Sequence, residues 1–229
     1  MLFEQSLLLI AQNTDEDIHE LSIRNDIAQL HLQLGETDLA LAELKKNNAD
    51  GINDGNIGMI LSNESGREKE ALRYLSDALL DNIASLINSS VGFSNVYAKQ
   101  KRYREALALL QTVRTFTNAL QQPNRVSYLV KTDVVLLTTS AVLSMQDGQA
   151  DAAKSYLQQA RQAALRFDAS PVFGVDGIRY LDELPNANVA DDFGETAMAG
   201  IEKMVQGVRD ELPQLVAIWQ AVKEASREA

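Results

Sequence analysis

A spacing that recurs four times constrains the fold of this chain more than any other feature. In each copy, a turn-forming residue is followed five positions later by alanine and four positions after that by leucine. Glycine in the turn permits the backbone to reverse, and a small residue at a fixed place in the next helix lets a neighbouring helix approach closely. The spacing therefore predicts a stack of antiparallel helix pairs. The four sets are Gly35/Ala40/Leu44, Gly66/Ala71/Leu75, Lys101/Ala106/Leu110 and Gly148/Ala153/Leu157.

The composition favours an all-α protein. Only four prolines occur in 229 residues, so long stretches of the chain can remain helical. Leucine, alanine, glutamine, glutamate and arginine dominate between the prolines, and all are good helix formers. The chain has no cysteine, which excludes a disulfide framework, a thiolate metal site and a cysteine nucleophile.

The net charge limits the classes of partner. With 32 acidic and 21 basic side chains, the formal net charge is −11. Such a surface repels a polyanion, so we expect no direct nucleic-acid binding by this chain. The one short basic segment, Lys99–Arg104, is expected to be ordinary solvated charge at a helix corner.

No segment is expected to enter a membrane. The apolar run Leu7–Ala11 is too short to cross a bilayer, and it lacks the basic lead-in of a signal peptide. The longer apolar stretch Val134–Leu143 is interrupted by hydroxyl residues, so we expect a buried helix there. Together with the absence of cysteine, this favours a cytoplasmic protein.

Apolar periodicity and turn residues predict four helix pairs between residues 16 and 167. A short helix at 2–12 is expected to precede them. We therefore divide the chain into a helical repeat array at residues 1–167 and a second region at residues 168–229. The eight helices of the array are expected at about 16–33, 38–47, 54–64, 67–81, 83–100, 103–120, 125–146 and 149–167.

The second region is expected to close the array. Residues 168–192 predict a mostly irregular segment, and two helices should follow at about 193–209 and 213–227, with Pro213 well suited to a first helical turn. A cap that covers an exposed apolar face is what a terminal repeat requires. The irregular segment is expected to be anchored by Ile178, Tyr180, Leu181 and Leu184, and the cap to bury Leu215, Val216, Trp219 and Val222.

The chain resembles the tetratricopeptide repeat (TPR) family over roughly residues 16–165. The resemblance implies a right-handed superhelix of antiparallel helix pairs with a concave groove. It departs from that family in lacking the motif's tryptophan and closing prolines, and in its uneven repeat length. The matching segments are Ala28-x6-Gly35-x4-Ala40-x3-Leu44, Met59-x6-Gly66-x4-Ala71-x3-Leu75-x2-Ala78, Ser94-x6-Lys101-x4-Ala106-x3-Leu110 and Ala141-x6-Gly148-x4-Ala153-x3-Leu157-x2-Ala160.

A narrower resemblance points to bacterial helix-turn-helix regulators. Residues 2–30, 167–171 and 191–198 look like parts of the C-terminal half of those proteins. There, a TPR-like region follows a DNA-reading domain and senses peptides or mediates dimerisation. Only about fifteen residues precede the first helix pair here, so we expect either an excised sensor half or a stand-alone relative.

Amide side chains recur on the first helix of successive pairs, which lines the concave face in TPR-like arrays. Asparagine is unfavourable inside helices, so its recurrence needs a reason. A side-chain amide both donates and accepts hydrogen bonds, which matches an extended peptide backbone. Solvated helix residues or local caps are the alternative, and Lys99 could pair with a peptide carboxylate or remain solvated. The predicted peptide-binding residues are Asn25, Gln29, Asn56, Asn63, Asn88, Asn95 and Lys99, and the same register also places Gln33, Ile60, Thr138, Val142 and Met145 on this face.

Catalytic and metal sites find little support. The loop Asp50–Asn56 superficially resembles a calcium loop, but Ile52 and Leu61 occupy ligand positions, so we expect a turn that joins two helices. The two histidines, His19 and His31, have no metal-binding motif around them. No serine or threonine stands in a nucleophile elbow. We expect no enzyme activity, no cofactor and no metal.

The sequence thus predicts a non-catalytic TPR-like module that binds a peptide or protein segment. Its expected setting is the ligand-sensing or dimerisation region of a cytoplasmic transcriptional regulator, with a second copy of the chain as a further partner. The alternative is a stand-alone scaffold for constitutive protein–protein assembly.

Overall fold

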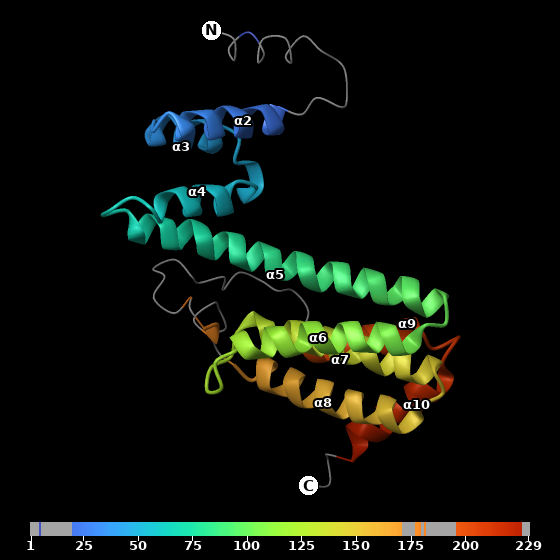
Figure 1. The fold of residues 1–229 in the computed structure, drawn as a ribbon. Helices are drawn as coiled ribbons and strands as arrows, with labels where there is room; N and C mark the ends of the chain where they lie inside the picture. The colour runs from blue at the N-terminus through green and yellow to red at the C-terminus, as the bar shows by residue number, and fades with distance from the viewer. Residues whose placement is uncertain (1–4, 6–19, 171–176, 180, 182–195, 226–229) are drawn as a thin grey trace. The chain divides into compact units, whose positions relative to one another are not determined.

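The computed structural model describes residue 5 and residues 20–170, 177–179, 181 and 196–225 (Figure 1). Within these residues it contains nine α-helices, one 3-10 helix and no β-strand, which confirms the expected all-α class. The chain divides into two compact units, which we call the N-terminal unit (Met1–Asn82) and the C-terminal unit (Ile83–Ala229).

The described N-terminal unit consists of short helices around a small aliphatic core. A positive-φ turn reverses the chain between the first two helices, and a 3-10 turn leads into the third. Its elements are α2 (Glu20–Gln33), α3 (Thr37–Lys46), η1 (Ala49–Gly51), α4 (Asp54–Leu61) and the first part of α5 (Glu68–Lys99). Its core consists of Ala28, Ala40, Leu41, Leu44, Ile57, Leu61 and Ala71.

The four turns adopt the conformation that the repeat requires. The turn residue has positive φ in every case: 75° at Gly35, 85° at Gly66, 60° at Lys101 and 75° at Gly148. Three of the turns also share a six-residue hydrogen bond, in which the N–H after the left-handed residue donates to a carbonyl five residues earlier. These bonds are Glu36 N to His31 O (2.8 Å), Arg102 N to Tyr97 O (2.9 Å) and Gln149 N to Ser144 O (2.8 Å).

The helix pair around Gly66 departs from this scheme by one position. Met59, the expected packing residue, is 61% exposed. Gly58 takes its place: a Cβ there would lie 2.7 Å from Leu75 Cγ and 3.0 Å from Leu75 N, so α4 and α5 meet through a glycine. Because α4 already ends at Leu61, the longer connection that follows can absorb a shift of register.

Helix α5 corrects the expected helix boundaries. We expected one helix at 67–81 and another at 83–100, but Glu68–Lys99 is one continuous helix of 32 residues. No glycine or proline lies between Ser76 and Val91 to end the helix, and Asp81 and Asn82 are accommodated within it. The boundary between the two units therefore falls inside a helix.

The described C-terminal unit contains the remainder of α5 and a deeper core. Its helices are α6 (Tyr103–Leu120), α7 (Tyr128–Gln146), α8 (Ala150–Asp168), α9 (Ala197–Gly207) and α10 (Pro213–Glu224). Aliphatic residues from α7 and α8 pack against residues from α9 and α10. The core consists of Val130, Val134, Leu137, Ala141, Ala153, Leu157, Ala160, Ala164, Phe167, Ala197, Ile201, Val205, Leu215, Trp219 and Val222.

The apolar helix expected around 134–143 is the centre of this unit. In the described part of the chain, α7 alone is long and apolar enough to cross a membrane by length and composition. About two thirds (67%) of its apolar stretch is buried inside the fold. A helix in the core of a globular unit passes the same test, and burial accounts for its composition.

The closing helices cover this core as expected. Trp219, Leu215 and Val222 are buried, and Val216 is partly buried against them. Helix α9 is tied to the end of α8, because Asp168 accepts hydrogen bonds from the first N–H groups of α9 at 2.8 and 3.0 Å. We predicted the second region to begin at residue 168, whereas α8, α9 and α10 share one core.

The segment after α8 is anchored where the structure describes it. Ile178 and Leu181 are buried, and Ile178 forms an isolated antiparallel bridge with Gln121. A Cβ at Gly177 would lie 2.9 Å from Ser127 Cβ, so glycine permits the close approach. The other two predicted anchors, at positions 180 and 184, lie outside the described residues.

Candidate functional site

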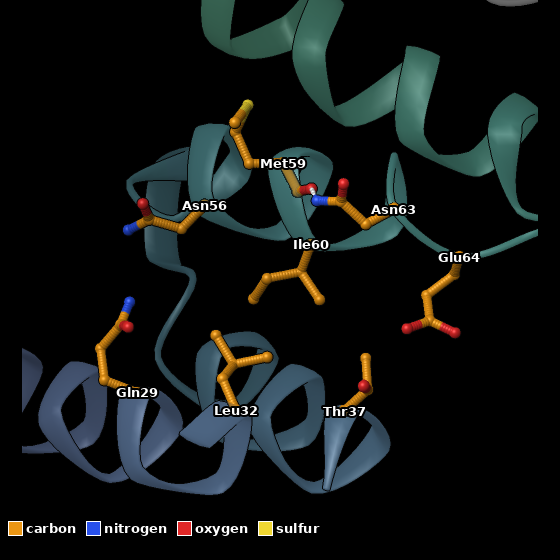
Figure 2. A pocket seen from close by; sticks show the side chains of 8 residues that line it. All are labelled: Gln29, Leu32, Thr37, Asn56, Met59, Ile60, Asn63 and Glu64. Carbon is orange, nitrogen blue, oxygen red and sulfur yellow. Dashed lines mark hydrogen bonds between the residues drawn. The ribbon is translucent and has the colours of Figure 1, made fainter. Parts of the chain in front are cut away.

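A pocket of about 380 Å³ opens in the N-terminal unit between α2 and α4 (Figure 2). Three of the seven predicted peptide-binding residues line it, and so does Ile60, which the same register placed on the concave face. The lining residues are Gln29, Leu32, Thr37, Asn56, Met59, Ile60, Asn63 and Glu64.

The pocket has an amide end, an apolar middle and an oxygen-rich end. Gln29 on α2 and Asn56 on α4 extend their amides toward one another across the opening (Figure 2). Leu32 and Ile60 face each other beside them and form the apolar middle (Figure 2). The far end carries the Thr37 hydroxyl and the Glu64 carboxylate.

A buried polar turn fixes where α4 begins and thus where its pocket residues lie. Asn48 accepts a hydrogen bond from Asn53 N at 2.7 Å and donates one to Asp54 Oδ1 at 2.7 Å. Asn53 is buried and donates its side-chain amide to Asn47 O at 2.8 Å. The glycine-rich segment therefore joins α3 to α4, as we expected.

The side-chain amides of Gln29 and Asn56 are available to form hydrogen bonds with a ligand. Within the described residues, neither Gln29 nor Asn56 makes a side-chain hydrogen bond. Asn63 differs, because its Nδ2 donates to Met59 O at 2.9 Å, the local capping role that was the alternative interpretation. Gln29 and Asn56 are therefore the strongest candidates for contact with a ligand.

The other predicted residue of α2 lies elsewhere. Asn25 is half-buried and is not part of the pocket wall, and its Oδ1 is enclosed without a hydrogen-bond partner. Gln33, one turn after Gln29, is exposed outside the pocket. Sequence reasoning did not place Leu32, Thr37, Met59 and Glu64 on this face. The signal for Leu32 was its i+3 spacing from Gln29, which places both side chains on one face of α2.

The remaining predicted residues belong to the C-terminal unit. Asn95 and Lys99 on α5 line a separate pocket of about 500 Å³, together with Val142 on α7. Asn88 is exposed and lines neither pocket. Five of the seven predicted residues thus line two separate pockets, one in each unit, while Asn25 and Asn88 line neither.

Two α7 residues expected on the concave face lie against the core. Thr138 is fully buried, and its hydroxyl donates to Val134 O at 2.7 Å. Met145 is partly buried against the core of the C-terminal unit. Because α7 is the central helix of that unit, more of its surface is enclosed than a concave-face helix would have.

Across residues 20–170 and the later described segments, no three histidine or acidic side chains form a cluster that could hold a metal ion. His31 Nδ1 lies 2.6 Å from Glu36 Oε2 at the end of α2, in the turn that leads to α3. The other predicted histidine, at position 19, lies outside the described residues.

Comparison with protein-family models, curated proteins and solved structures found no match to this chain. The pocket geometry and the chemistry of its side chains therefore carry the functional proposal.

Proposed function

We propose that this chain is a non-catalytic peptide-binding protein and that its N-terminal unit captures an extended peptide between α2 and α4. One observation carries the proposal: the amides of Gln29 and Asn56 face each other across a pocket without hydrogen-bond partners in the described structure.

The chemistry of the pocket suits a peptide backbone. An extended peptide presents alternating N–H and C=O groups, and an amide side chain can donate to one and accept from the other. Leu32 and Ile60 lie beside the amides and can receive one apolar side chain of the ligand. Backbone recognition with one shallow apolar subsite binds peptides with little regard for their sequence.

The proposed setting is a TPR-like superhelix in the sensing or dimerisation region of a cytoplasmic transcriptional regulator. The left-handed turns and the burial of Ala40, Ala71, Ala106 and Ala153 support the TPR-like arrangement. A peptide that binds one curvature of such an array more tightly favours that curvature, which can change how two subunits associate.

Short unrelated peptides, each with capped termini and a fluorescent label, test the proposal by fluorescence anisotropy. We expect peptides of different sequence to bind with similar affinity. The same peptides with N-methyl groups on alternate backbone nitrogens should bind at least about tenfold more weakly, because they lack the N–H donors that the amides require.

Variants identify the pocket. Gln29→Leu combined with Asn56→Leu should abolish the preference for unmethylated peptides, while Gln33→Leu, the same change on the exposed face of α2, should preserve it. Equal binding of methylated and unmethylated peptides by the wild-type protein would overturn the backbone-recognition mechanism, as would unchanged affinity in the double variant.

A second candidate is assembly with another copy of the chain through α5. Leu86, Phe93 and Val96 are 41%, 59% and 50% exposed on the part of α5 that belongs to the C-terminal unit. A Cβ at Gly92 would meet no atom within 4 Å, so a second helix could approach there. Light scattering on wild type and Phe93→Ser tests this: a dimer that becomes a monomer favours assembly, with Leu165→Ser on α8 as the control.

A further inference from the structure

The pocket of the C-terminal unit differs in chemistry from the peptide pocket. It occupies about 500 Å³, within the range of roughly 300–1,000 Å³ of small-molecule sites. Three elements supply its walls: α5, α7 and the segment between α9 and α10. The residues that matter here are Lys99 on α5, Val142, Leu143 and Gln146 on α7, and Val208 and Glu211 beyond α9.

The pocket brings together one cation and one anion that do not pair. Both Lys99 and Glu211 line it, and no ion pair or hydrogen bond of either side chain occurs among the residues that the structure describes. Both side chains are exposed to solvent, so a ligand can reach them. Elsewhere in the same unit, Arg114 does pair with Asp133, at 2.6 Å. Two opposite charges left apart in one pocket can each receive a ligand group of the opposite sign.

An amide in the same wall also lacks a partner. Gln146 lines the pocket, and its Oε1 is enclosed without a hydrogen bond. A buried acceptor without a donor is unfavourable, so a ligand N–H group that engages it is favoured. The side-chain amide can turn about its terminal bond to meet such a donor.

The rest of the wall is apolar. Leu143 is buried at 2% exposure, and Val142 and Val208 are partly buried and pack against the core of the unit. A ligand that suits this lining therefore carries two opposite charges and a hydrocarbon group.

We propose that this pocket binds a free, zwitterionic α-amino acid with an aliphatic side chain. Its carboxylate pairs with the Lys99 ammonium, and its ammonium donates to Glu211 and Gln146. Its side chain packs on Val142, Leu143 and Val208. An internal peptide residue carries neither charge, and a phosphate would be repelled by Glu211, so both fit the pocket less well.

This site is independent of the proposed peptide capture. It uses no residue of the N-terminal unit, and its ligand carries the free charged termini that a capped peptide lacks. Failure of one proposal leaves the other standing, and the two pairs of variants report on them separately.

Calorimetric titration and thermal unfolding with L-leucine test the proposal on the full chain. L-leucine at millimolar concentration should release or absorb heat on binding and raise the melting temperature, because a ligand that binds only the folded state stabilises it. N-acetyl-leucine lacks the ammonium and leucinamide lacks the carboxylate, so each should bind at least about tenfold more weakly. Glycine lacks the aliphatic side chain, so it should also bind more weakly if the apolar wall contributes to binding.

Two charge-removing variants locate the site. Lys99→Gln and Glu211→Gln should each weaken L-leucine binding about tenfold or more, because each removes one charge-assisted hydrogen bond. The matched controls Lys154→Gln on α8 and Glu224→Gln on α10 remove exposed charges that do not line this pocket and should leave binding unchanged.

Three results would overturn the proposal. The first is the absence of heat and of any change in melting temperature with L-leucine. The second is equal binding of L-leucine and its two blocked derivatives, which would show that the charges are not recognised. The third is wild-type affinity in both Lys99→Gln and Glu211→Gln.

Discussion

The N-terminal and C-terminal units share one sequence spacing but differ in what fills the space between their helices. In the N-terminal unit the described core is aliphatic and its largest buried side chains are Leu and Ile residues. In the C-terminal unit, α10 adds Trp219, and α9 and α10 together extend the core across four helices. The spacing sets the turns and the close contacts, whereas the capping helices determine how deep the core becomes.

The pockets of the two units differ in a parallel way. Neutral amides, Gln29 and Asn56, face the N-terminal pocket, while Lys99 and Glu211 bring opposite charges to the C-terminal one. Pockets at similar places in a helix-pair repeat can therefore be suited to different ligands. The repeat predicts where a pocket lies better than what it binds.

Removing Trp219, the largest fully buried side chain of the C-terminal core, should have the largest effect. Trp219→Ala should destabilise that unit by about 3–5 kcal/mol, because it deletes a fully buried side chain. It also removes the hydrogen bond from Trp219 Nε1 to Glu202 Oε2, which measures 2.7 Å. Amide hydrogen exchange followed by mass spectrometry should show faster exchange throughout α7–α10.

The same measurement tests whether the two units are independent. We expect exchange in α2, α3 and α4 to stay unchanged in Trp219→Ala, since their core contains no residue of the C-terminal unit. Leu165→Ala, at an exposed position of α8, is the control and should change little. Equal acceleration in both units would show that they unfold as one.

Enlarging the repeat alanines should have the next largest effect and should do so in both units. Ala40 and Ala153 are fully buried, so Ala40→Leu and Ala153→Leu should each cost about 1–3 kcal/mol through overpacking. Ala42→Leu, on the exposed face of α3, is the matched control. Urea denaturation monitored by circular dichroism gives the free energy of unfolding. Tolerance of leucine at both buried positions would contradict the close helix contact.

The turns and the cap could both be predicted from the sequence because both depend on local chemistry. A position with left-handed backbone conformation favours glycine, and glycine occupies three of the four turn positions: Gly35, Gly66 and Gly148. The cap residue Trp219 could be predicted because an apolar face at regular spacing must be covered. The turns and the cap each depend on a few residues that are close together in the sequence.

The features that the sequence did not reveal are those for which two local structures, such as a turn and a continued helix, both fit the same residues. Asp81 and Asn82 are typical of a turn, yet α5 continues through them, since nothing there forbids a helix. Gly58 replaces Met59 at the close contact because the connection after α4 is longer. For the pocket, the spacing identified Gln29 and Asn56, but which amides would face each other depended on that register.

Substitutions at two of the turn residues should each change the free energy of unfolding by about 1 kcal/mol, with opposite signs. Lys101 has φ of 60°, a conformation that costs a residue with a side chain roughly 1–2 kcal/mol, so Lys101→Gly should stabilise the protein slightly. Gly148→Ala should destabilise it by about 1 kcal/mol through the backbone alone, because an added Cβ meets no atom within 4 Å. Thermal unfolding distinguishes the two signs.

Gly92→Ala separates turn geometry from helix propensity. Gly92 lies within α5, its φ is not positive, and its Cβ position is open. Alanine there should stabilise the helix by about 0.5–1 kcal/mol, opposite to the effect at Gly148. If alanine had the same sign at both glycines, the left-handed turn would not be the cause.

The smallest expected effect concerns an acidic group that belongs to the N-terminal unit alone. Desolvation and the nearby charges of Asp54 and Asp81 raise the pKa of Asp77 above its ordinary value of 3.8, against the opposing effect of Arg73. The folded protein therefore holds this proton to higher pH than the unfolded chain does. It follows that the ionisation of Asp77 opposes folding and that its cost appears as the pH rises above 3.8.

Asp77→Asn should therefore stabilise the N-terminal unit at neutral pH and lose this advantage below pH 3.8, where the wild-type carboxyl is protonated in both states. The gain should stay below about 1 kcal/mol, because the side chain is largely exposed and water screens its charge. Hydrogen exchange of α4 and the start of α5 at both pH values measures it, with Asp26→Asn on the exposed face of α2 as the control. If the Asp77 variant gained as much at low pH as at neutral pH, its effect would come from something other than charge.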